Sequence, residues 1–168
     1  MSADVIELIL ADHRRFEDLF RLLRDSSNDR DQVLGELAGL LVAHAEAEES
    51  EVYPALRRFK GIDDHEVEHG AEEHAEGHVA LLAVLEAGAA GSEQWDEKLE
   101  DLVKAVNHHV DEEERTILDD ARRNVPDERR AELGERFLSV REERIKAGCG
   151  DLTHVRELVE QTKDRIDD

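Results

Sequence analysis

Two short stretches of this sequence each place a histidine four residues before a glutamate, and a second glutamate follows directly. The stretches contain His44, Glu48 and Glu49, and His109, Glu113 and Glu114. On an α-helix, residues four apart lie on one face, about 6 Å apart along the axis. Each stretch can therefore direct an imidazole and a carboxylate at the same point, which is the arrangement that a metal ion requires.

Four amphipathic segments must hold these residues in place. In each segment, apolar residues recur at alternating spacings of three and four, which is typical of a helix with one buried face. The segments are residues 4–24, 30–58, 65–88 and 93–122. Short turns rich in polar residues or glycine separate them, so consecutive helices should be antiparallel. We predict an all-α protein, an up-down-up-down four-helix bundle with additional helices at its C-terminus.

Histidines and glutamates interrupt the apolar faces of all four segments. The interrupting residues are His13, His44, Glu48, His74, His78, His109 and Glu113. One histidine on such a face is usually a hydrogen-bonded core residue. A buried glutamate without a partner, however, costs several kcal/mol, and two of them beside five imidazoles require cations or a water-filled cavity. We therefore predict a metal centre inside the bundle.

The types of ligand restrict the metal. Imidazole and carboxylate ligands without thiolate suit iron, manganese or zinc, and their number exceeds what one tetrahedral zinc needs. Two octahedral ions fit the set, with the five histidines as terminal ligands, Glu48 and Glu113 as bridges, and an oxo or hydroxo group completing the pair. Ferritin-like proteins carry the opposite order, Glu-x-x-His, with more carboxylates, so ferritin-like iron oxidation is disfavoured.

In their order on four helices, these residues resemble the hemerythrin family, in particular its bacterial branch of HHE cation-binding domains. The resemblance covers about residues 4–120 and implies a non-haem site with two iron ions. The residues that match the pattern of this branch are His13, His44, Glu48, His74, His109 and Glu113. His78 matches the second histidine of the His-x-x-x-His helix in oxygen-carrying hemerythrins. Those carriers have an aspartate five residues after the last histidine, where this chain has Glu114.

Two positions are open to Tyr53. On an ideal helix this residue lies about 180° from His44 and packs at the end of the bundle. Pro54 removes a backbone hydrogen bond and should kink or end the helix near residue 50. A one-residue π-bulge there would turn Tyr53 by roughly 100° towards Glu48. Because a phenolate is a known ligand of ferric iron, Tyr53 is a candidate ligand in that second position.

Other polar residues near these motifs are expected to have supporting or surface positions. Glu49 and Glu114 should accept hydrogen bonds from ligand histidines and so orient them. His65 and His69 fall near the start of their helix, where exposure is expected. His108 precedes a ligand histidine but points off the buried face, so we expect it beside the site or at the surface.

The composition limits the partners and the compartment. The chain has 168 residues, 39% of them charged, and a formal net charge of −22, which argues against nucleic acid or anionic membrane as a partner. A lone Cys149 excludes an internal disulfide and fits a reducing compartment. The first residues resemble neither a signal peptide nor a membrane span, so we expect a cytoplasmic protein.

Two parts of the chain are expected to differ in role. Residues 1–124 should form the bundle with its di-iron site, and residues 125–168 a C-terminal helical extension. Leu133, Phe137 and Val140 predict an amphipathic helix in the extension, which packs on the bundle or on a protein partner. We expect a monomer or a weak oligomer.

The resemblance implies binding or redox chemistry of a small ligand, namely dioxygen, nitric oxide or hydrogen peroxide. An enzyme of this kind would be a di-iron oxidoreductase with catalase-like or nitric oxide-detoxifying activity. It would work through its metal, because the sequence has no Ser/His/Asp set, P-loop or dinucleotide fingerprint. The alternative is an iron- or oxygen-responsive sensing module without turnover, in which a partner binds the C-terminal helices. Iron storage is less favoured, because two ions per chain are too few without a cage.

Overall fold

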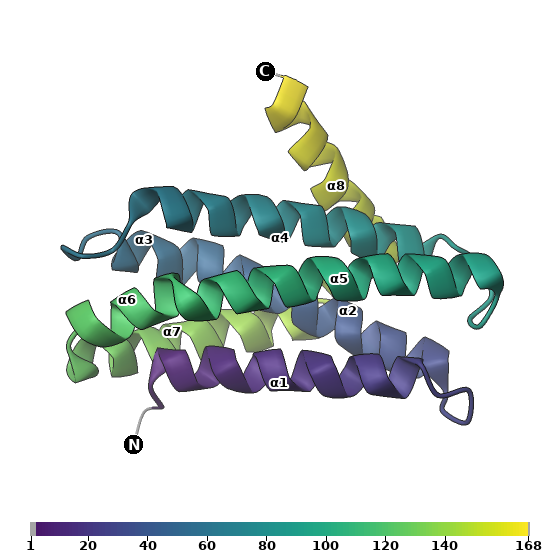
Figure 1. Cartoon of the computed structure of the whole chain (residues 1–168), viewed down its shortest axis with the longest axis horizontal. Helices are drawn as coiled ribbons and strands as arrows, with labels where there is room; N and C mark the ends of the chain where they lie inside the picture. Colours follow the sequence, from purple (N-terminus) through teal and green to yellow (C-terminus); the bar gives the residue numbers. More distant parts are fainter. Residues whose placement is uncertain (1–2, 168) are drawn as a thin grey trace.

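The computed structural model describes residues 3–167, with side chains to residue 164, and every regular element in that range is helical. The elements are α1 (Val5–Leu23), α2 (Arg30–Ala47), η1 (Glu48–Val52), α3 (Tyr53–Leu56), α4 (Asp64–Leu85), α5 (Glu93–Arg115), α6 (Ile117–Asn124), α7 (Asp127–Lys146) and α8 (Leu152–Asp167). The long helices α1, α2, α4 and α5 run antiparallel in sequence order (Figure 1). The predicted all-α bundle is confirmed.

The four bundle helices α1, α2, α4 and α5 begin at capped turns. An aspartate or serine precedes each one, and its side chain accepts a hydrogen bond from an amide of the first turn. These N-caps are Asp4, Asp29, Asp63 and Ser92. Such caps satisfy amides that have no partner within the helix. They also fix where each helix starts, and therefore which residues face the interior.

The second predicted helix, residues 30–58, is interrupted just before Pro54. It consists of α2, the π-helical segment η1 and the single turn α3. The amide of Tyr53 bonds to the carbonyl of Glu48, five residues back, which is the hydrogen bond of a π-helix. Pro54 has no amide to donate, so the backbone leaves α-helical geometry here. The predicted interruption near residue 50 therefore takes the form of a π-helical segment.

The fourth predicted helix, residues 93–122, is not continuous. It ends at Arg115, and α6 begins at Ile117 after a break at Thr116, whose φ and ψ are −111° and −83°. The hydroxyl of Thr116 donates to the carbonyl of Glu112 at 2.7 Å. Bonds of this kind compete with the helical hydrogen-bond pattern and bend helices.

Two apolar clusters fill the interior. One lies towards the α1–α2 turn and includes Phe16, Phe20, Leu37, Trp95 and Leu102. The other lies towards the opposite end and includes Ile6, Ile9, Val52, Leu56 and Ile117. Their burial is the main favourable contribution to the folding free energy. The polar residues of the predicted site lie between these clusters.

The C-terminal helices pack on the bundle. Helix α7 contacts α1 and α2, and α8 contacts α4, although its end projects away from the bundle (Figure 1). Phe137 of α7 is completely buried. At the α7–α8 turn, a Cβ added to Gly150 would lie 2.4 Å from the backbone nitrogen of Gly39, so only glycine allows this close contact. Within the described residues, no helix combines the length and the apolar character needed to cross a membrane.

Candidate metal centre

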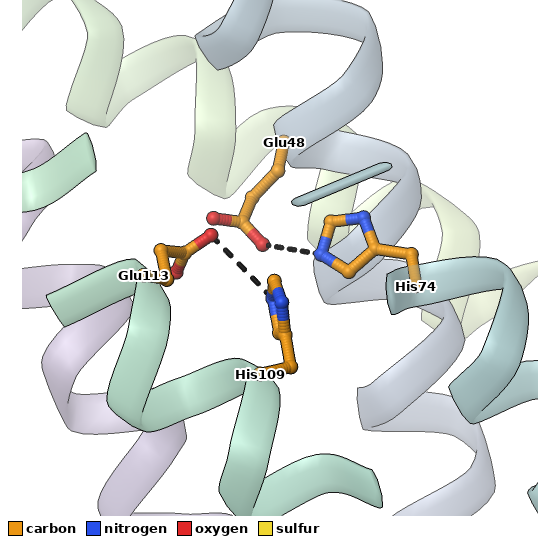
Figure 2. Close-up of side chains that lie close together, drawn as sticks. All are labelled: Glu48, His74, His109 and Glu113. Atoms are coloured by element: carbon orange, nitrogen blue, oxygen red, sulfur yellow. Dashed lines mark hydrogen bonds and ion pairs between the residues drawn. The ribbon is translucent and has the colours of Figure 1, made fainter. Parts of the chain in front are cut away.

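Six of the predicted site residues meet in the middle of the bundle. They are His13, His44, Glu48, His74, His109 and Glu113, and all six are buried. Four of them, which come from η1, α4 and α5, point towards one another in Figure 2. The spacing of polar residues in the sequence thus corresponds to a real convergence of side chains from all four long segments.

Glu48 lies between two histidines. Its Oε1 is 2.9 Å from Nε2 of His44 and 3.1 Å from Nε2 of His74. Burial alone would lower the pKa of His44, but the carboxylates of Glu48 and Asp12 outweigh it and raise that pKa from 6.5 to about 10. Burial is likewise outweighed at His74, where Glu48 and Glu49 raise the pKa to about 10. Without a metal, these two imidazoles are therefore protonated at neutral pH.

Glu113 lies between two other histidines. Its Oε1 is 3.2 Å from Nε2 of His13, and its Oε2 is 3.5 Å from Nε2 of His109. Its Oε2 also accepts a hydrogen bond from the hydroxyl of Tyr53. The buried ligand atoms form two groups, which are His13–His44–Glu113 and Glu48–His74–His109–Glu113. Glu113 belongs to both groups and so connects them.

Several buried atoms of this centre have no hydrogen-bond partner. They are Nε2 of His13, His44 and His109, Oε2 of Glu48 and Oε1 of Glu113. Four of these five atoms are in ion-pair contact at 2.9–3.5 Å, but the contacts lack hydrogen-bond geometry. Because buried polar atoms are usually hydrogen-bonded, this concentration of incompletely satisfied atoms would be unusual for a purely structural cluster. Lone pairs on imidazole and carboxylate are the donors that cations of the iron–zinc type accept. The residues therefore fit a metal centre.

Each of the four convergent histidines also forms a hydrogen bond with a carboxylate on the side of its ring that faces away from the centre. The Nδ1 atoms donate to these carboxylates, namely His44 to Asp12 (2.8 Å), His74 to Glu49 (3.1 Å), His109 to Glu73 (3.2 Å) and His13 to Glu114 (3.2 Å). Every bond joins two neighbouring helical segments, and the four bonds form a closed circuit around the bundle. An acceptor at Nδ1 fixes the tautomer that leaves the Nε2 lone pair free for a metal.

Two of these four carboxylates were predicted, and two were not. The hydrogen bonds expected for Glu49 and Glu114 are confirmed. Asp12 and Glu73 were missed, although both are buried. The signal available in the sequence was their position, because each immediately precedes a predicted ligand histidine of its own helix. Each supports the histidine of the next helix instead, which spacing along one helix does not reveal.

Helix α7 also reaches the back of this centre. Nε of Arg141 lies 3.1 Å from Oδ2 of Asp12, the same oxygen that accepts from His44. The ring of Phe137 meets the ring of His44 edge-on, with 5.4 Å between centroids. The C-terminal extension thus forms part of the wall behind His44.

Of the two positions open to Tyr53, the structure has the one beside the centre. The segment η1 directs this side chain inwards, where it stacks on His74 at 5.7 Å between ring centroids. Its hydroxyl donates to Glu113. Burial, together with the negative charge of Glu113 and Glu48, raises the pKa of Tyr53 well above 10, so the phenol keeps its proton in the metal-free site.

His78 is buried but lies outside both ligand groups. Burial and the nearby His74 lower its pKa from 6.5 to about 4, so it is neutral, and its Nε2 has no hydrogen-bond partner. It lines a cavity of about 30 Å³ together with three histidines of the candidate centre and mainly apolar residues. These neighbours are His44, His74, His109, Phe16, Leu81 and Val106.

Comparison with known proteins gives two findings. The family model for the hemerythrin HHE cation-binding domain matches residues 4–121. A protein named DNA nickase from Nostoc sp. (strain PCC 7120 / SAG 25.82 / UTEX 2576) is 26% identical over 140 residues, which cover 82% of this chain and 39% of that protein. This chain thus spans less than half the length of that relative.

No solved structure matches this chain. The family model, however, covers well over half of it and includes every residue of both ligand groups. The match also agrees with the helical bundle and with the buried imidazoles and carboxylates at its centre. The chain therefore belongs to the hemerythrin family, as a protein with an HHE cation-binding domain.

Proposed function

We propose that this protein is a non-haem di-iron protein that binds dioxygen, nitric oxide or hydrogen peroxide, or processes one of them by redox chemistry. The observation that carries the proposal is the pair of buried ligand groups that share Glu113. The residues that would hold the ions are His13, His44, Glu48, His74, His109 and Glu113. Glu48 and Glu113 each contact histidines of both groups, which supports a bridging role.

The supporting residues match the same function. Two iron ions would supply the capacity to exchange two electrons with a small ligand. The carboxylates behind the histidines hold the imidazoles in one orientation, so the site is organised before any ion enters. The apolar clusters on both sides exclude bulk water, which prevents side reactions.

The cavity next to His78 supports a small ligand. Its volume of about 30 Å³ exceeds the roughly 10–15 Å³ that one water molecule needs. A diatomic molecule or peroxide fits such a space, whereas a larger organic substrate does not. His78 lines this cavity and has a buried Nε2 without a hydrogen-bond partner, and we propose that it either binds an ion as a terminal ligand or bonds to the small ligand.

Tyr53 is proposed to contribute a proton or a ligand atom. In the metal-free site its hydroxyl keeps a proton and donates it to Glu113 in a hydrogen bond. If the phenol loses this proton to a base on metal binding, its oxygen becomes available as a ligand. The stacking on His74 keeps the ring in place in either state.

A sensing module without turnover is the second candidate, and one observation favours it. Arg141 of α7 contacts Asp12, so a change at His44 has a direct route to the C-terminal helices. Measuring nitric oxide and peroxide turnover of the iron-loaded protein at pH 7 separates the candidates. Turnover well above that of an equal amount of free iron supports an oxidoreductase. Turnover no faster than free iron leaves binding or sensing as the function.

The name of the Nostoc relative does not change this proposal. This chain covers only 39% of that protein, so the two need not share an activity. A formal net charge of −22 opposes association with a polyanion, because binding to phosphates depends on lysine and arginine. We propose that the shared feature is the metal-binding bundle.

A further inference from the structure

A third His-x-x-x-Glu pair lies on the outer side of α4. His69 and Glu73 are four residues apart, as are the two pairs in the buried centre, and His108 approaches them from α5. As expected from the sequence, the two histidines are exposed, with side chains 49% and 62% accessible. Glu73 is buried, with a side chain only 4% accessible. The sequence alone did not indicate that these three residues meet.

The three side chains are arranged around one point. Oε2 of Glu73 is 3.1 Å from Nε2 of His108 and 3.7 Å from Nε2 of His69. One ligand atom from each residue lies within 4.8 Å of the others. Oε2 of Glu73 is nevertheless buried without a hydrogen-bond partner, so neither contact has hydrogen-bond geometry. The three ligand atoms are therefore close together while the buried carboxylate oxygen has its hydrogen-bonding capacity unfilled.

Glu73 is held firmly in this position. Its other oxygen, Oε1, accepts the hydrogen bond from Nδ1 of His109. The carboxylate thus has one oxygen committed to the buried centre and one oxygen left for the surface. The two exposed histidines can move by the small amount that ligation requires, because solvent surrounds much of each ring.

The charge around this cluster favours a cation. Glu66 and Glu112 line a small cavity of about 20 Å³ beside His69 and Glu73. Glu72 lies 3.6 Å from His69. Carboxylates in such a concentration create a negative potential that raises the local concentration of cations.

We propose that His69, Glu73 and His108 form a third cation site, which is accessible to solvent and separate from the two buried ligand groups. Two imidazoles and one carboxylate suit a divalent first-row transition cation such as Zn²⁺, Fe²⁺ or Co²⁺ and disfavour Ca²⁺ and Mg²⁺, which prefer oxygen ligands. Three protein ligands leave room for water or an external ligand.

The test uses Zn²⁺ as the probe. The metal in the protein as purified is counted first, and Zn²⁺ binding is then measured by equilibrium dialysis in the presence of excess Mg²⁺. We expect one additional Zn²⁺ per chain, with the original metal content unchanged. In His69→Ala and His108→Ala, binding should weaken by more than the roughly 10–100-fold that loss of an outer partner causes. A gain of Zn²⁺ matched by a loss of the original metal would overturn the proposal.

The matched control is His65→Ala, which removes an exposed histidine of the same helix. It should bind the additional Zn²⁺ as tightly as the native protein. All three positions are exposed, so the variants should fold, and equal helical circular dichroism checks this. No additional Zn²⁺ in the native protein, or equal binding by all three variants, would contradict the site.

Discussion

At the level of single residues, the buried centre pairs carboxylates with imidazoles of opposite charge. Glu48 is completely buried, yet its pKa is well below its ordinary value, because the charges of His44 and His74 outweigh the effect of burial. In the metal-free protein, protonated imidazoles thus replace the cation. A metal must displace those protons, so loading should release protons to the solvent and weaken as the pH falls.

The raised pKa values of His44 and His74 predict how the metal-free protein responds to pH. Both values are about 10 in the folded chain, against about 6.5 in the unfolded chain. The stability that these histidines contribute is therefore complete below pH 6.5 and is lost as the pH rises towards 10. We expect urea denaturation of the metal-free protein to show a loss of a few kcal/mol over this range. A constant free energy of unfolding would contradict the charge pairing.

Tyr53 can be tested by its spectrum. We expect the oxidised, iron-loaded protein to show a strong low-energy visible band from phenolate ligation, and we expect Tyr53→Phe to lose it while keeping its iron. The substitution removes only the hydroxyl and leaves the ring stacked on His74. If the spectra of the two proteins are the same, Tyr53 is not a ligand.

At the scale of elements, the bulged backbone at η1 decides where Tyr53 points, and α4 leaves room for it at Gly70. A Cβ at Gly70 would lie 3.1 Å from the hydroxyl oxygen of Tyr53 and 3.2 Å from Cδ1 of Ile117. We expect Gly70→Ala to displace Tyr53, to shift the visible band and to destabilise the protein by about 1–3 kcal/mol through overpacking.

Gly35→Ala is the control for this substitution, because a Cβ at Gly35 meets nothing within 4 Å. It should leave the spectrum unchanged and stabilise α2 by roughly 0.5–1 kcal/mol, the usual gain over a helical glycine. Spectra and thermal denaturation measure both effects. A Gly70→Ala protein with the native band would show that Tyr53 does not need this space.

The elements also explain what the sequence could and could not predict. The periodic polar residues correctly located the six convergent ligand candidates, because the spacing along each helix determines which residues share a face. Asp12 and Glu73 were missed because each pairs with a histidine of a different helix. The spacing of residues along one helix does not show which residues of a neighbouring helix lie beside it. The break at Thr116 coincides with a local hydroxyl–carbonyl bond, which hydrophobic periodicity does not indicate. Pro54 indicated an interruption, but not which way Tyr53 would turn.

At the scale of the whole molecule, residues beyond the family match take part in the centre. The match ends at residue 121, whereas Arg141 and Phe137 lie behind His44 from α7. Asp12 thus connects a predicted ligand on one side with the C-terminal extension on the other. We propose that the extension stabilises the metal-loaded form.

Arg141→Gln tests this connection. The variant loses the charge that holds Asp12, so His44 is less well oriented, and we expect iron loss to a chelator to be roughly 10-fold faster. Arg136→Gln changes an exposed arginine of the same helix and should release iron at the native rate. Equal rates for the two variants would contradict a role for α7 in holding the metal.

We propose that the bundle holds two iron ions between His13, His44, Glu48, His74, His109 and Glu113. Metal analysis of the purified native protein and of Glu113→Ala tests this proposal. Because Glu113 belongs to both ligand groups, we expect about two iron ions per native chain and a loss of both in the variant. One zinc ion per native chain, or an unchanged iron content in Glu113→Ala, would contradict a di-iron centre at these residues.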